Sequence, residues 1–124
     1  MKTGLTYTST LAVESRHLAV QVGSGDLEVL ATPIMLTLME NAAMLAVKDV
    51  LEESMTTVGG YISSSHLRPT APGRTVTATA ILTAIDGRKL TFKVTAQDET
   101  GIIGEGEHLR FIVDRKKFMA RIKE

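Results

Sequence analysis

The stretch TPIMLTLMENAAMLAVKDVLEES, residues 32–54, decides the fold of this chain. Its only proline, Pro33, stands at the start, where the missing N–H of a proline costs a helix nothing, and the stretch contains no glycine. At about 100° per residue, most of its apolar side chains fall on one broad arc, as in an amphipathic helix. The arc contains Met35, Leu36, Met39, Ala42, Ala43, Ala46, Val47, Val50 and Leu51. The stretch therefore predicts one long helix, with Thr32 as its N-cap.

Three further apolar residues of this helix, Ile34, Leu38 and Leu45, fall outside the arc. A helix whose apolar surface extends beyond one face is covered on more than one side. We therefore expect a sheet, or a partner chain, to wrap around this helix.

The segments at the C-terminal side of the helix have the period of two that is typical of β-strands. Residues 74–86 alternate cleanly between two faces and end in an Asp-Gly pair, which predicts a hairpin turn. A return strand at 89–97, a second turn at 98–101 and a last long strand at 102–113 follow. Together these segments predict an antiparallel meander.

Two further strands are predicted outside the meander. Residues 5–13 alternate weakly, and residues 61–68 form a short polar strand. Residues 14–22 are ambiguous, and the glycine-rich residues 23–26 predict a loop. The order of strand, long helix and meander predicts an α+β fold in which about five antiparallel strands wrap one central helix, the hotdog arrangement. We expect residues 1–124 to form this one domain.

The composition argues against several classes of function. Fourteen basic residues balance fourteen acidic ones, so no global positive field is available to hold nucleic acid or an anionic membrane. The sequence has no cysteine, which excludes disulfides and thiolate chemistry. The three histidines, His17, His66 and His108, lack metal-ligand spacing, so no metal is expected. Because neither a signal peptide nor a membrane-spanning stretch is evident, we expect a cytoplasmic protein.

Three side chains are candidates for chemistry, and each also has an ordinary structural interpretation. Glu40 lies within the apolar arc, either as a rim glutamate that reaches water or as a pocket carboxylate that acts as a base or nucleophile. Thr32 is a helix cap, and its hydroxyl also lies where the helix dipole favours developing negative charge. His66 follows three serines and is either a surface group or a proton carrier.

A set of short motifs, taken in order along the chain, resembles the fluoroacetyl-CoA thioesterase-like branch of the hotdog thioesterases. The resemblance runs from about Leu5 to Arg121. It rests on Glu28-Val29-Leu30-Ala31-Thr32, Leu38-Met39-Glu40-Asn41-Ala42-Ala43, Thr57-Val58-Gly59, His66 with Pro69-Thr70, Pro72-Gly73, Asp86-Gly87-Arg88, Asp98 before Gly101-Ile102-Ile103-Gly104, and His108-Leu109-Arg110. No single motif is specific, but their order and spacing are those of the family.

The resemblance implies an enzyme that hydrolyses a small or short-chain acyl-CoA thioester to the free acid and CoA. It implies Thr32, Glu40 and His66 as the catalytic set, and it assigns Gly59 and Arg110 to substrate binding. Glu40 would attack the thioester carbonyl directly or activate a water, and both routes stay open. No cofactor is implied beyond the CoA of the substrate. A homodimer, or a larger homo-oligomer, with its sites at the interface is expected.

One segment departs from the family pattern. The fluoroacetyl-specific enzyme has an aromatic-lined lid, whereas residues 22–27, VGSGDL, contain no aromatic residue. We therefore expect thioesterase activity without that particular specificity.

Further alternatives stay open. The C-terminal basic residues are either a solvated tail or a partner for the phosphates of CoA; they are Arg115, Lys116, Lys117, Arg121 and Lys123. The same fold also supports a non-hydrolytic acyl-CoA binding module or a hydratase, although hotdog hydratases usually pair an Asp with a His and position 40 is a glutamate.

Overall fold

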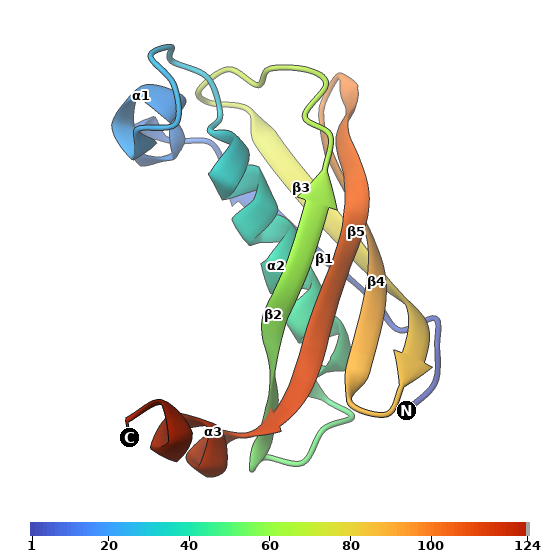
Figure 1. The fold of residues 1–124 in the computed structure, drawn as a ribbon. Helices are drawn as coiled ribbons and strands as arrows, with labels where there is room; N and C mark the ends of the chain where they lie inside the picture. The colour runs from blue at the N-terminus through green and yellow to red at the C-terminus, as the bar shows by residue number, and fades with distance from the viewer. Residues whose placement is uncertain (124) are drawn as a thin grey trace.

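A computed structural model describes residues 1–123, in which one antiparallel sheet curls around one long helix (Figure 1). The strands are β1 (Thr6–Ala12), β2 (Met55–Ser64), β3 (Thr75–Asp86), β4 (Lys89–Asp98) and β5 (Gly101–Asp114). The helices are a 3₁₀ turn (Ser15–His17), α1 (Ala19–Val22), α2 (Thr32–Lys48) and α3 (Arg115–Ile122). The short helices α1 and α3 lie at opposite ends of the molecule (Figure 1).

The five strands follow the order β1-β3-β4-β5-β2, and every neighbouring pair is antiparallel. The predicted meander is confirmed, because β3, β4 and β5 are joined by two tight turns. Gly87 and Gly101 adopt positive φ values of 60° and 130° at these turns, a backbone conformation that favours glycine. In this order, β1 and β2 are the two edge strands of the sheet.

The long helix is shorter than its sequence predicts. It ends at Lys48 instead of continuing to about residue 54, and residues 49–54 form a turn that leads into β2. Ala31, with an extended backbone (φ −68°, ψ 135°), is the N-cap, so the prediction of Thr32 as the cap is wrong. The Thr32 hydroxyl has a side-chain partner instead of a backbone N–H of the helix.

The second strand also differs from its prediction. The sequence places a short strand at 61–68, whereas β2 begins at Met55 and ends at Ser64. It pairs with β5 over its whole length, from Met55 opposite Asp114 to Ser64 opposite Gly106, with a register shift between Gly59 and Tyr61. This edge strand carries a mixture of exposed and half-buried residues, which hides the period of two that marks a strand.

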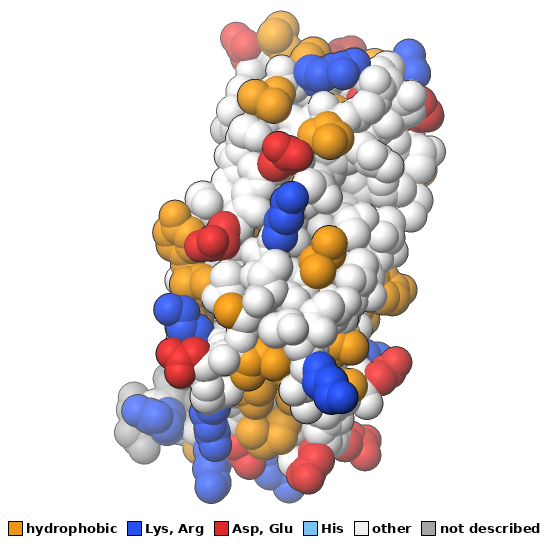
Figure 2. Space-filling view, turned by 90° about the vertical axis from the view of Figure 1, so that its right-hand side faces the viewer, with side chains coloured by type: hydrophobic (Ala, Val, Ile, Leu, Met, Phe, Trp, Pro, Cys, Tyr) orange, Lys and Arg blue, Asp and Glu red, His pale blue; other side chains and the backbone are white. Residues whose placement is uncertain are grey.

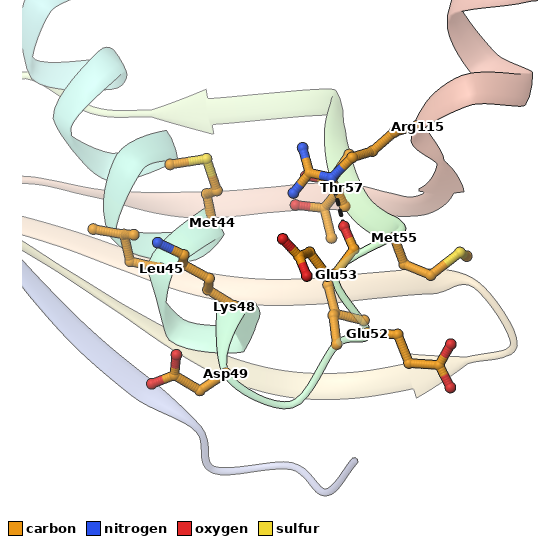
Figure 3. Close-up of a pocket in the computed structure, with 11 residues that line it drawn as sticks. Met44, Leu45, Lys48, Asp49, Glu52, Glu53, Met55, Thr57 and Arg115 are labelled. Carbon is orange, nitrogen blue, oxygen red and sulfur yellow. Dashed lines mark hydrogen bonds between the residues drawn. The ribbon is translucent and has the colours of Figure 1, made fainter.

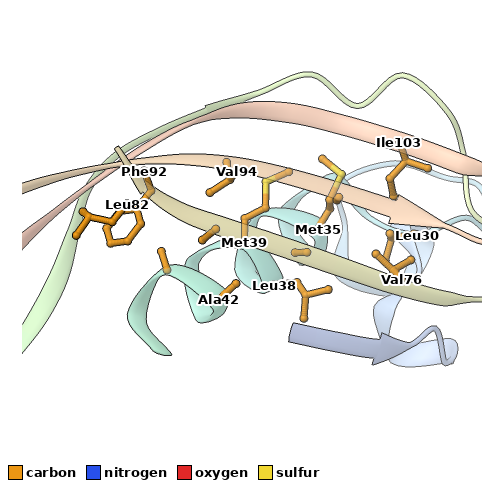
Figure 4. Packing of buried hydrophobic residues seen from close by; sticks show 14 of the residues in the cluster. Leu30, Met35, Leu38, Met39, Ala42, Val76, Leu82, Phe92, Val94 and Ile103 are labelled. Carbon is orange, nitrogen blue, oxygen red and sulfur yellow. The ribbon is translucent and has the colours of Figure 1, made fainter. Parts of the chain in front are cut away.

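The core lies between α2 and the concave face of the sheet (Figure 4). The helix contributes Met35, Leu38, Met39, Ala42, Ala43 and Val47, and the sheet contributes Val76, Ala78, Ala80, Leu82, Leu90, Phe92, Val94, Ala96 and Ile103. Leu38 is buried although it lies outside the predicted arc, because β1 and β3 also pack against the helix. The opposite flank of α2, which carries Leu36, Glu40 and Met44, is only half-buried. The helix thus leaves the flank that carries Glu40 partly open.

Candidate active site

Thr32 and His66 form one pair at the beginning of α2. Their side chains are joined by a hydrogen bond of 2.7 Å between Thr32 Oγ1 and His66 Nδ1. His66 lies in the loop that follows β2, and the loop is held beside β5 by a hydrogen bond from the Leu67 N–H to the Ile103 carbonyl. Burial lowers the pKa of His66, so its imidazole is neutral at neutral pH. Its Nε2 atom is buried and has no hydrogen-bond partner among residues 1–123.

A hollow of about 370 Å³ lies beside this pair. It is lined by Ala19, Ser24, Gly25, Asp26, Leu27, Val29, Leu30, Thr32, His66, Leu67, Arg68 and Pro69. The lining comes from the first residues of α1 and α2, from the loop between these helices and from the loop after β2, and it contains no Phe, Tyr or Trp. Small, aliphatic, polar and charged side chains therefore form most of the wall of this hollow.

Glu40 forms a second group with Arg110. The carboxylate Oε2 lies 3.8 Å from Arg110 Nη1, and the side chains are 43% and 8% exposed. Arg110 is fixed by Thr57, because its Nε donates to the Thr57 hydroxyl (2.8 Å) and its Nη2 donates to the Thr57 carbonyl (3.0 Å). A buried, firmly held guanidinium therefore faces a half-exposed carboxylate.

His108 completes the second group, and its hydrogen bonds determine its tautomer. Its Nδ1 lies 2.7 Å from the Tyr61 carbonyl oxygen, which only accepts, so Nδ1 carries the proton. Nε2 is then free to accept a hydrogen bond from Arg110 Nη1 at 3.2 Å. Burial, with a smaller contribution from the charge of Arg110, lowers the pKa of His108. The neutral ring therefore orients the arginine that faces Glu40.

Gly59 lies against this group. A Cβ atom added at Gly59 would lie 3.0 Å from Glu40 Oε2, 3.4 Å from His108 Cε1 and 3.6 Å from Arg110 Nη1. A side chain at this position would crowd the carboxylate, so the glycine is explained by close approach rather than by a turn. The backbone of β2 therefore passes directly beside the Glu40 carboxylate.

The sequence-predicted residues thus fall into two groups rather than one. The first contains Thr32 and His66, and the second contains Glu40, Gly59 and Arg110. Eight residues of one helix separate Thr32 from Glu40, which corresponds to about 12 Å along the helix axis. No hydrogen bond or ion pair joins the two groups within residues 1–123.

His108 and Thr57 are the members of the second group to which the sequence assigns no role. Their signal in the sequence is weak. His108 lies two residues before Arg110, and this spacing places both side chains on one face of a strand. Thr57 lies two residues before Gly59, but its pairing with Arg110 depends on the register between β2 and β5.

The described residues contain neither a metal-binding cluster nor a membrane-spanning helix. Over residues 1–123, no three His, Asp or Glu side chains gather in a way that would hold a metal ion. None of the helices in this range has the length and apolar character needed to cross a bilayer.

A sheet of five antiparallel strands curled around one helix is the hotdog fold, so the predicted fold class is confirmed. A family model described as fluoroacetyl-CoA-specific thioesterase matches residues 13–116. The fluoroacetyl-CoA thioesterase of Streptantibioticus cattleyicolor is 39% identical over 97 residues, which are 78% of this chain and 70% of that protein. The chain therefore belongs to the fluoroacetyl-CoA thioesterase family of hotdog proteins, as its motifs predicted.

Solved structures agree with this assignment. A variant of the fluoroacetyl-CoA thioesterase in complex with acetyl-CoA has a TM-score of 0.94 and 32% identity, covering 99% of this chain and 97% of the other. A thioesterase superfamily member from Thermus thermophilus has a TM-score of 0.90 and 26% identity, covering 98% and 90% of the two chains. The family resemblance thus extends over the whole architecture.

Proposed function

We propose that this thioesterase hydrolyses small acyl-CoA thioesters with Glu40 as its reactive carboxylate. The observation that carries the proposal is the environment of the Glu40 carboxylate. This carboxylate is half-exposed and faces the fixed guanidinium of Arg110, and the side of it that faces β2 is next to the backbone of Gly59, which has no side chain. A thioester carbonyl would approach over Gly59, where no side chain intervenes. Glu40 would then attack the carbonyl directly or activate a water.

In the proposed reaction, a C–O bond forms at the carbonyl carbon and the C–S bond breaks. The thiolate of CoA leaves and must receive a proton, which water supplies overall. His66 suits the transfer of this proton, because its neutral imidazole would first accept a proton from the attacking water and then give it to the thiolate. Its Nε2 is free of protein partners within residues 1–123 and is the atom that would accept it. The hydrogen bond with Thr32 orients the imidazole ring.

We further propose that each active site is shared between two copies of the chain. The separation of about 12 Å along α2 is too large for Glu40 and the Thr32–His66 pair of one chain to act on one carbonyl group. The outer edge of β2 has no neighbouring strand in the sheet order, and edge strands of this kind pair readily with another chain. A two-fold dimer through this edge would bring Glu40 of one copy to the Thr32–His66 pair of the other.

The proposed acyl group is small but not specifically fluoroacetyl. The relatives that carry the fluoroacetyl name support a small group, and the hollow beside Thr32 and His66 has room for one. Its lining lacks the aromatic side chains of a fluoroacetyl lid. A single domain over residues 1–124 and a cytoplasmic location remain predictions from the sequence.

The proposal is tested by replacing Glu40→Gln and measuring thiol release from a panel of acyl-CoAs. We expect kcat to fall at least about a hundredfold, because the amide is neither a nucleophile nor a base. Glu107→Gln is the matched control, since Glu107 is exposed on β5 and makes no side-chain hydrogen bond or ion pair within residues 1–123. Unimpaired turnover by Glu40→Gln would refute the role of Glu40.

The unmodified protein distinguishes the alternative functions. Binding of acyl-CoA without thiol release would indicate a non-hydrolytic module, and addition of water to an enoyl-CoA would indicate a hydratase.

A further inference from the structure

A second hollow, of about 640 Å³, lies between α3 and the adjoining end of the sheet, far from the Thr32–His66 pair. It is lined by Met55, Arg88, Val113, Asp114, Lys117, Phe118, Arg121 and Ile122. We call it the α3 hollow. The activity proposed above leaves it unexplained.

Three cationic side chains surround the α3 hollow. Arg88 comes from the turn between β3 and β4, whereas Lys117 and Arg121 come from α3. None of the three side chains makes a hydrogen bond or an ion pair within residues 1–123. The one acidic lining residue, Asp114, accepts a hydrogen bond from the Lys117 backbone N–H as the cap of α3. In Figure 2, lysine and arginine side chains lie at this end of the molecule with aspartate and glutamate side chains among them.

The remaining lining of the α3 hollow is apolar. Phe118 is half-buried and Ile122 is 60% exposed, and Met55 and Val113 add aliphatic surface from the sheet. An aromatic and aliphatic wall beside arginines suits a flat base that carries phosphates better than it suits a bare inorganic anion.

A third hollow, of about 520 Å³, lies between the end of α2 and the beginning of β2 (Figure 3). Glu40 and Arg110 do not line it, but a neighbour of each residue does. Met44, which lines it, lies one helical turn beyond Glu40 on the same flank of α2. Thr57, the residue that holds Arg110, lies on its other side, and Met55 lines both this hollow and the α3 hollow. In Figure 3, Met44 and Lys48 of α2 lie across the hollow from Thr57 and Arg115.

The distance between the two ends of this path suits one extended ligand. Four residues of β5 separate Arg110 from Asp114, which corresponds to about 13 Å. The pantetheine arm of CoA, which links the thioester to the nucleotide, is a flexible chain long enough to span such a distance.

We propose that the α3 hollow binds the phosphorylated adenosine end of CoA through Arg88, Lys117 and Arg121. The pantetheine arm lies in the hollow between α2 and β2, and the thioester reaches Glu40 and Gly59. This inference rests on the proposed thioesterase function, which it deepens by assigning a binding site to the part of the substrate that does not react.

The test is the triple variant Arg88→Ala/Lys117→Ala/Arg121→Ala, assayed with acetyl-CoA, acetyl-3′-dephospho-CoA and S-acetylpantetheine. We expect KM for acetyl-CoA to rise at least about tenfold with kcat unchanged, since charge-assisted phosphate contacts are lost away from the reacting atoms. KM for S-acetylpantetheine should not change, because this substrate has no nucleotide. The dephospho substrate should show an intermediate increase.

Two further variants make the comparison specific. Lys2→Ala/Arg74→Ala/Lys93→Ala removes the same charge from exposed positions outside both hollows and should leave every KM unchanged. Arg88→Lys/Lys117→Arg/Arg121→Lys keeps the charge and should restore most of the affinity for acetyl-CoA.

The two proposals fail in different ways. Equal KM values for acetyl-CoA in the unmodified protein and the alanine triple variant, with turnover intact, would overturn the nucleotide site alone. Absence of thiol release from all three substrates in the unmodified protein would overturn the thioesterase function. In that case, calorimetry with adenosine 3′,5′-bisphosphate still decides the site. Binding that the alanine triple variant loses supports it, and equal or absent binding refutes it.

Discussion

At the scale of single residues, the site is built from side chains that act through one another. Thr57 holds Arg110, His108 accepts from Arg110, and the guanidinium faces Glu40. The sequence assigned roles to Glu40 and Arg110 but none to Thr57 or His108. Spacing along a strand identifies residues on one face, whereas contacts between β2 and β5 depend on a register that the sequence does not state.

His108 makes the protein sensitive to acid. Its pKa, like that of His66, is lowered below the ordinary value of 6.5, mainly by burial. The folded state therefore binds these protons more weakly than the unfolded state, so stability is present above about pH 6.5 and decreases as the pH falls through the lowered pKa values. We predict that Tm decreases between pH 7 and pH 5, and that His108→Gln has a smaller decrease over the same range.

Thermal unfolding of both proteins at a series of pH values checks this prediction. Glutamine keeps a donor and an acceptor for Tyr61 and Arg110 but does not titrate. His17→Gln is a useful control, because it removes a histidine at a distant position of the fold. An equally steep decrease in Tm for His108→Gln would show that His108 does not contribute to the acid sensitivity.

At the scale of elements, the strands with one buried face were predictable and the edge strand was not. The clean alternation of β3 follows from one face packed on the core, whereas β2 mixes half-buried and exposed residues. The helix was also predicted too long, since Val50 continues the apolar pattern but is 49% exposed in the turn before β2. The periodicity of a sequence identifies its apolar residues, but it does not show which of these residues are buried against other elements in the folded chain.

The close pairing of β2 with β5 depends on Gly106. A Cβ atom there would lie 2.7 Å from both the carbonyl carbon of Ser63 and the Cα of Ser64. We predict that Gly106→Ala lowers the free energy of unfolding by about 1–3 kcal/mol, because the backbone of β2 must move away. Urea denaturation measures this change. The control is Glu107→Ala at the exposed neighbouring position, which should change the free energy of unfolding by less than about 0.5 kcal/mol. An equal decrease in the free energy of unfolding for both variants would contradict the packing argument.

At the scale of the whole molecule, the hotdog arrangement follows from the order of strand, helix and meander, and it was predicted correctly. The two separate groups of site residues were not foreseen. Eight residues of the predicted helix already imply about 12 Å between Thr32 and Glu40 along its axis. The contacts that divide the residues into two groups depend instead on how the strands and loops pack beside that helix. The proposal of a shared site rests on the half-buried flank of α2 and on the edge position of β2 in the sheet.

A mixed dimer tests the shared site directly. We expect Glu40→Gln and His66→Ala each to inactivate both sites of a homodimer. In a heterodimer purified through two different tags, Glu40 of one chain meets His66 of the other at one site, and that site is intact. We therefore predict about half the activity of the unmodified dimer. A heterodimer without activity would place both groups within one chain, and a monomer by light scattering would exclude the shared site.

The loop that lines the hollow beside Thr32 and His66 contributes walls but none of the five proposed site residues. Ser24, Asp26 and Leu27 can therefore change without altering the contact between Glu40 on α2 and Arg110 on β5. Because of this separation, a few substitutions in one exposed loop would change which acyl group the enzyme accepts. The five proposed site residues would stay the same, so new specificities could evolve without loss of the catalytic residues.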